Sequence, residues 1–133
     1  MARRVLVAED DPPIQSMLHE FLLEEGFEVD VASHGGEALQ LARTKPPDVG
    51  VFDVMMPIVD ARTLLAEWQQ DSGLKTIPVI LLSAAPGLSE IAAHFNVRAT
   101  LAKPLDRDVL RAIIHQVLAH PETPPDVPVV PAE

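Results

Sequence analysis

Short apolar runs alternate with amphipathic helical patterns along most of this chain, and that alternation constrains the fold more than any other feature. Most of the runs are largely apolar, as strands buried on both faces of a sheet are. The second run alternates with acidic residues and is expected at an edge of the sheet. In chain order, the predicted strands are Val5–Ala8, Phe27–Ala32, Val49–Asp53, Ile77–Leu82 and Val97–Ala102.

Apolar residues at helical spacing follow every predicted strand. The first helix is expected to begin at Pro12 and Pro13, because proline suits a first helical turn, and to stop at Gly26. The apolar positions place helices at residues 14–22, 38–42, 64–68, 88–95 and 110–117. This alternation predicts an α/β fold, namely a flavodoxin-like (βα)5 doubly wound parallel sheet with strand order 2-1-3-4-5.

The length of 133 residues suits one domain, which we expect to span residues 1–119. From His120 onward the composition changes, because five prolines fall in a stretch that has acidic residues but no lysine or arginine. Residues 120–133 are therefore predicted to be a proline-rich acidic tail or linker without fixed structure.

Charge and cysteine content exclude several classes of function. Ten Lys and Arg residues face twenty Asp and Glu residues, which gives a formal net charge of -10. This balance argues against direct binding to nucleic acid or to an anionic membrane, since both need a basic surface. The chain has no cysteine, which rules out disulfides, thiolate metal sites and thiol nucleophiles. The sequence shows no signal peptide or membrane span, so a cytoplasmic location is expected.

Residues that can carry chemistry stand at the carboxyl ends of the predicted strands, where ligands bind in open parallel sheets. In chain order they are Glu9, Asp10 and Asp11, then Asp53, then Ser83, and finally Lys103 before Pro104. Clustered carboxylates repel one another, and a hard cation such as Mg²⁺ relieves the repulsion. A carboxylate can also carry a phosphoryl group, whose oxygens a lysine and a hydroxyl can contact. The pattern therefore predicts a metal-assisted phosphoryl-transfer site.

These motifs, in this order, resemble the receiver domain of two-component response regulators over about residues 3–119. The resemblance rests on the acidic pair after the first strand, on Asp53, on Ser83 and on the Lys103-Pro104 dipeptide. It implies that a histidine kinase or a phosphotransfer protein donates a phosphoryl group to Asp53.

The resemblance also assigns roles to the surrounding residues. It implies Mg²⁺ as the cofactor, with four ligands: Glu9, Asp10, Asp53 and the main-chain carbonyl of Met55. Ser83 and Lys103 would contact the phosphoryl group, and the Lys103–Pro104 peptide is usually cis in the family. The implied protein is a signalling module rather than an enzyme. Its output would pass through contacts with a downstream protein effector or a separate output domain.

The sequence departs from the family pattern at the switch position of the fifth strand. The family has Tyr or Phe there, three residues before the lysine, whereas this chain has Thr100. An alternative hypothesis is therefore a degenerate receiver that binds partners independently of phosphorylation. An aspartyl phosphatase is a weaker alternative, because Met55 stands where such enzymes carry their acid-base aspartate.

Several residues also have simpler structural interpretations. The acids after the first strand could cap the following helix, and we expect Asp11 to have that role. Trp68 lies on the apolar stripe of the third helix and is expected to pack in the core. The histidines show no metal-ligand spacing and are expected at the surface without a role.

Overall fold

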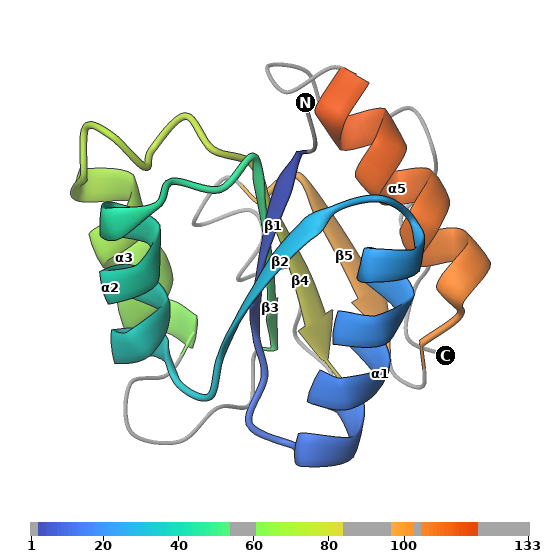
Figure 1. The fold of residues 1–133 in the computed structure, drawn as a ribbon. Helices are drawn as coiled ribbons and strands as arrows, with labels where there is room; N and C mark the ends of the chain where they lie inside the picture. Colours follow the sequence, from blue (N-terminus) through green and yellow to red (C-terminus); the bar gives the residue numbers. More distant parts are fainter. Residues whose placement is uncertain (1–2, 54–60, 84–96, 103–104, 120–133) are drawn as a thin grey trace.

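The chain folds into an open sheet that carries helices on both faces (Figure 1). The structure, a computed structural model, describes residues 3–53, 61–83, 97–102 and 105–119. Within these residues the strands are β1 (Arg4–Ala8), β2 (Glu28–Ala32), β3 (Val49–Asp53), β4 (Val79–Ser83) and β5 (Ala99–Ala102). The described helices are α1 (Pro12–Glu24), α2 (Gly35–Thr44), α3 (Ala61–Gln70) and α5 (Arg107–Ala119).

All paired strands are parallel, and the strand order is β2-β1-β3-β4-β5. The predicted topology is confirmed. Every residue of β3 is buried, as expected of a strand with neighbours on both sides. In β2, which is an outermost strand of the sheet, Glu28 is exposed and only Ala32 is fully buried. Because the strands are parallel, all of their carboxyl ends lie at one edge of the sheet, which we call the carboxyl edge.

The two faces of the sheet have separate hydrophobic cores. Val5 and Val7 of β1 belong to the core beneath α1 and α5, whereas Leu6 and Ala8 belong to the core beneath α2 and α3. Successive side chains of a strand point to opposite faces, so a strand covered on both sides is apolar at consecutive positions. Figure 1 shows α1 and α5 on one side of the sheet and α2 and α3 on the other.

Helix α1 ends at the glycine that the sequence indicates. The N–H of Gly26 donates to the carbonyl of Leu23 at 3.0 Å, and the N–H of Phe27 donates to the carbonyl of Leu22 at 3.1 Å. These two bonds form a Schellman motif. Gly26 has a φ of 93°, a conformation that glycine adopts without strain, and it turns the chain into β2.

Strand β4 begins two residues later than predicted, at Val79 rather than Ile77. The reason is Pro78, which has no N–H to donate to a neighbouring strand. Its carbonyl still accepts a hydrogen bond from the N–H of Gly50 at 3.0 Å. The proline therefore marks the entry to the strand without weakening its pairing with β3.

Strand β5 also begins later than predicted, at Ala99 rather than Val97. The helix predicted at residues 88–95 and the tail predicted at residues 120–133 lie outside the described residues. The predicted end of the domain near residue 119 stays a prediction.

Trp68 packs in the core, as predicted, and is 2% exposed. Its ring meets Phe52 edge to face, with centroids 5.1 Å apart and planes at 78°. The indole N–H donates to the carbonyl of Ile77 at 3.2 Å. Since Phe52 directly precedes Asp53, α3 braces the strand end that carries this aspartate.

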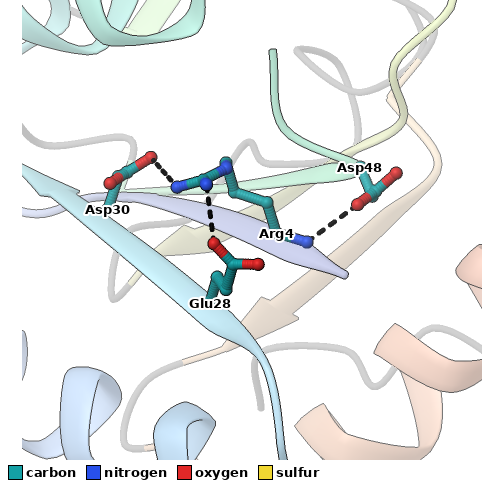
Figure 2. A network of polar contacts seen from close by, with 4 residues as sticks. All are labelled: Arg4, Glu28, Asp30 and Asp48. Carbon is teal, nitrogen blue, oxygen red and sulfur yellow. Dashed lines mark hydrogen bonds and ion pairs between the residues drawn. The ribbon is translucent and has the colours of Figure 1, made fainter. Parts of the chain in front are cut away.

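At the amino edge of the sheet, which lies opposite the carboxyl edge, Arg4 contacts three acidic residues (Figure 2). The guanidinium of Arg4 lies 2.7 Å from Glu28 and 2.9 Å from Asp30, both in β2. The main-chain N–H of Arg4 donates to the carboxylate of Asp48 at 2.7 Å, and its carbonyl accepts from the N–H of Asp48 at 2.8 Å. These four residues, the Arg4 cluster, join β1 to β2 and to the residue before β3.

The longest helices that the structure describes, α1 and α5, have 13 residues each. A membrane span needs about 20 apolar residues. Among the described helices, none has the length and apolar character needed to cross a membrane.

Candidate functional site

Three carboxylates meet at the carboxyl edge of the sheet. Glu9 and Asp10 follow β1, and Asp53 is the last residue of β3. One oxygen from each side chain lies within 4.8 Å of the other two. Glu9 is fully buried and Asp53 is 3% exposed, whereas Asp10 is exposed. We call these three residues the acidic cluster; it has two members in the protein interior and one open to solvent.

The register of the sheet explains why these acids meet. Ala8 of β1 lies opposite Phe52 of β3 in the parallel ladder. The residues that follow, Glu9 and Asp53, are therefore neighbours across the same pair of strands. Asp10 comes one residue further along the loop into α1.

Several hydrogen bonds hold the chain around Glu9. Its N–H donates to the carbonyl of Ala32 at 3.0 Å, which extends the pairing of β1 with β2 by one residue. Its carboxylate accepts from the N–H of Asp11 at 3.2 Å, and its carbonyl accepts from the side-chain amide of Gln15. A bond to the buried carboxylate offsets part of the cost of removing that charge from water.

Asp11 occupies the N-cap position of α1, as predicted, but it does not cap the helix through its side chain. Within the described residues, its side chain makes no capping hydrogen bond. The first helical positions are Pro12 and Pro13, which have no N–H, so Ile14 has the first N–H that a cap could bind. The main-chain carbonyl of Asp11 accepts from the N–H of Gln15 at 2.9 Å and so starts the helix.

The structure describes the other predicted site residues only in part. Ser83 is the last residue of β4 and pairs with Ala102 of β5. Thr100, at the switch position, is buried in β5. Three predicted residues lie outside the described part of the chain, namely Met55, Lys103 and Pro104. The roles assigned to all five site residues beyond the acidic cluster stay predictions.

Gln15 is a residue of this region that the sequence did not indicate. Its side-chain amide donates to the carbonyl of Glu9 and to the hydroxyl of Ser33 at 3.1 Å. It thus joins the loop that carries the acids to the loop between β2 and α2. The one available signal is a polar residue in the first turn of α1 next to apolar Ile14. Nothing in that pattern shows which loop the amide faces.

The donors of the acidic cluster suit a small, hard cation. In an octahedral Mg²⁺ site, oxygens at about 2.0–2.1 Å from the ion are about 3 Å apart when adjacent and about 4 Å apart when opposite. The three carboxylate oxygens, which all lie within 4.8 Å of one another, need only small shifts to reach these separations. Mg²⁺ binds through a few carboxylates and keeps several waters, which the exposed side of Asp10 can admit. The residues present therefore fit Mg²⁺.

A comparison of the sequence with known families agrees with this arrangement. The family model of the response regulator receiver domain matches residues 5–115. The chain belongs to this family. Receiver domains are modules of two-component signalling and are typically not enzymes. The resemblance drawn from the motifs is thereby confirmed, together with the flavodoxin-like fold.

Individual relatives of this receiver domain support the assignment. The probable transcriptional regulator ycf29 of Pyropia yezoensis is 32% identical over 121 residues, which are 90% of this chain and 54% of that protein. The chain spans about half the length of the ycf29 regulators and of the response regulator Rre1 of Synechocystis, which it also resembles. The signal receiver domain of a histidine kinase from Syntrophus aciditrophicus has a TM-score of 0.83 at 26% identity. The match covers 97% of this chain and 99% of that one.

A further solved structure carries a metal ion. It is the receiver domain of a sensor histidine kinase from Pseudomonas aeruginosa, with a TM-score of 0.83 at 24% identity, and the match covers 90% of this chain and 99% of that one. That structure has a magnesium ion coordinated in its active site cleft. At this identity, the likeness shows the shared fold.

Proposed function

We propose that this receiver domain accepts a phosphoryl group on Asp53 from a histidine kinase or a phosphotransfer protein, in a Mg²⁺-dependent reaction. The supporting observation is the acidic cluster, whose oxygens lie within 4.8 Å of one another at the carboxyl edge of a receiver domain. Asp53 suits the role of nucleophile because it ends a fully buried strand. That strand has neighbours on both sides, so the position of this carboxylate is well fixed.

In this proposal, separate groups hold the metal and the phosphoryl group. Mg²⁺ is held by Glu9, Asp10, Asp53 and the main-chain carbonyl of Met55. When bound, the ion neutralises negative charge between the carboxylate and the phosphoryl oxygens. Ser83 and Lys103 donate hydrogen bonds to the remaining phosphoryl oxygens. The magnesium ion in the related Pseudomonas aeruginosa domain supports this assignment.

The transfer itself is a displacement at phosphorus. A carboxylate oxygen of Asp53 attacks the phosphorus of a phosphohistidine, and the new O–P bond forms as the N–P bond breaks. The imidazole nitrogen leaves with the electron pair of that bond and takes a proton from solvent. The product on this chain is an acyl phosphate. Placement of the carboxylate and neutralisation of charge carry such a transfer, so the fold contributes chiefly by positioning.

The test is phosphorylation by a small phosphodonor such as acetyl phosphate. Intact mass spectrometry should show a gain of one phosphoryl group when Mg²⁺ is present and none when EDTA removes it. Asp53→Asn should abolish the gain, because the amide is not a nucleophile. Asp48→Asn, a matched change at the amino edge, should leave the gain intact. A wild-type chain without the added mass, or an added mass that survives Asp53→Asn, contradicts the proposal.

We also propose that output passes through contacts with a downstream protein effector or a separate output domain. Thr100 favours a second candidate, a receiver that binds its partner independently of phosphorylation. Thr100 is 7% exposed in β5 and has no ring that could move between two positions. Amide NMR spectra before and after phosphorylation decide between the two. Shifts that reach α5 favour a switching receiver, and shifts confined to the acidic cluster favour the second candidate.

A further inference from the structure

We infer that Gln15 is a positioning residue for the acidic cluster. Its side-chain amide fixes the loop that carries Glu9 and Asp10 and so holds their carboxylates ready for Mg²⁺. Gln15 would act through the loop and not as a ligand of the ion. This inference rests on the proposed function of the acidic cluster.

The two peptide groups on either side of Asp10 are both held. The carbonyl of Glu9 belongs to the peptide group before Asp10, and it accepts a hydrogen bond from the Gln15 side chain. The N–H of Asp11 belongs to the peptide group after Asp10, and it donates to the carboxylate of Glu9 at 3.2 Å. Since peptide groups are planar, fixing both sets the backbone angles of Asp10 and the direction in which its side chain leaves the loop.

Gln15 is itself held at a fixed place. It lies in the first turn of α1, where its N–H donates to the carbonyl of Asp11 at 2.9 Å. Its side-chain amide also donates to the hydroxyl of Ser33 at 3.1 Å. The N–H of Ser33 in turn donates to the carboxylate of Glu37 in α2 at 2.7 Å. The Gln15 side chain therefore starts from α1 and is connected to α2 through Ser33, so little of its freedom remains to be lost when an ion binds.

The acidic cluster has a physical need for such a restraint. Asp53 is fixed by a central strand, whereas Asp10 is exposed and lies on a loop. Carboxylates at this spacing repel one another, and repulsion drives the most mobile of them away. A loop held in place keeps Asp10 near its partners before the ion arrives, and this lowers the cost of assembling the site.

The test compares Mg²⁺ binding by calorimetric titration of the full chain. Gln15→Met keeps the length and helix propensity of the side chain but removes its donors. Partners that orient metal ligands typically contribute about 10- to 100-fold in affinity, so we expect Gln15→Met to weaken Mg²⁺ binding by roughly 10-fold or more. Ser33→Ala, which removes only the second anchor, should weaken it less. Gln40→Met, at an exposed glutamine of α2, should leave it unchanged.

A second readout separates positioning from mere stability. In phosphorylation by acetyl phosphate, Gln15→Met should raise the Mg²⁺ concentration needed for half-maximal rate by the same factor. The rate at saturating Mg²⁺ should stay near that of the wild type. Urea unfolding in EDTA, run on each variant, shows how far stability alone has changed. A role in stability alone would lower the unfolding midpoint and leave both Mg²⁺ measurements unaltered.

The outcomes distinguish this inference from the function on which it rests. A wild-type chain that binds no Mg²⁺ overturns both. A wild-type chain that binds Mg²⁺, with Gln15→Met binding it equally well, overturns the role of Gln15 alone. An equal loss in Gln40→Met also overturns it. Should Gln15→Met fail to fold, Gln15→Asn carries the same expectation, because its amide is one methylene too short to bridge the two loops.

Discussion

The acidic residues at the two edges of the sheet have different neighbours. At the amino edge, Glu28 and Asp30 of the Arg4 cluster lie 2.7 and 2.9 Å from a guanidinium (Figure 2). At the carboxyl edge, the carboxylates of the acidic cluster lie within 4.8 Å of one another. Two of the three carboxyl-edge acids are deeply buried, since Glu9 is 0% and Asp53 3% exposed, whereas Asp10 is exposed and the side chain of Asp30 at the amino edge is 22% exposed.

This difference separates acids that contact an arginine from acids that lie close to one another. A carboxylate beside an arginine is stabilised where it stands, and it ties neighbouring strands to each other. Carboxylates placed close to one another repel, and a bound cation relieves that repulsion. Natural proteins keep such unfavourable local arrangements chiefly where function requires them. The contrast between the edges therefore supports a role for the acidic cluster beyond folding.

The largest stability effect is expected at the Arg4 cluster. Arg4→Met should lower the free energy of unfolding by about 1–2 kcal/mol, because it removes a partly buried ion pair with Asp30 and a more exposed one with Glu28, and leaves two acids of β2 without the arginine between them. Urea unfolding in EDTA measures this loss. Mg²⁺ affinity should not change, since the cluster lies at the opposite edge.

Arg43→Met provides the matched control, because its ion pair with Asp71 is made by a side chain that is 50% exposed. It should cost less than Arg4→Met, since water screens an exposed pair. Equal losses would mean that burial adds nothing at the amino edge.

The same change, from aspartate to asparagine, can be made at each edge and its effect on stability compared. Asp30→Asn should lower the free energy of unfolding by about 0.5–1 kcal/mol, since it removes an ion pair with Arg4. Asp10→Asn should raise it by about 0.5–1 kcal/mol in EDTA, since it removes repulsion within the acidic cluster. Saturating Mg²⁺ should cancel the gain, because the amide is a poorer ligand than the carboxylate. The same sign for both substitutions would contradict the proposed difference between the edges.

The fold could be predicted because most of the strands are short apolar runs, and the edge strand β2 alternates apolar with acidic residues. Strand β3 shows this best, since its predicted bounds, Val49–Asp53, are those of the structure. Strand β4 shows where hydropathy fails to predict the start of a strand. A hydropathy pattern includes Pro78, but a strand needs N–H donors, which proline lacks.

The site could be predicted only where it depends on strand ends. Asp53 and Glu9 come together because parallel strands end at one edge, and sequence alone indicates that. Gln15 could not be found, because its partner Ser33 lies 18 residues away on another loop. His34 was expected to have no role, yet its Nδ1 accepts from the N–H of Glu37 at 3.2 Å and caps α2. Such contacts depend on side-chain rotamers and on which loops adjoin, and periodicity describes neither.

The smallest expected effect concerns Asp71, in the loop after α3. A hydrogen bond from Arg43, at 3.1 Å, holds the pKa of Asp71 below its ordinary value, and the N–H of Gly73 adds to this at 2.8 Å. A carboxyl whose pKa is lower in the folded chain than in the unfolded chain stabilises the fold above its ordinary pKa. That contribution is lost as the pH falls through the lowered value.

Asp71→Asn should therefore slightly reduce the loss of stability between about pH 5 and pH 2, as urea unfolding at a series of pH values would show. The change should be smaller than that of Arg4→Met, because Asp71 and Arg43 meet at the surface, where solvent screens them. An unaltered pH profile would mean that this exposed pair contributes nothing to stability.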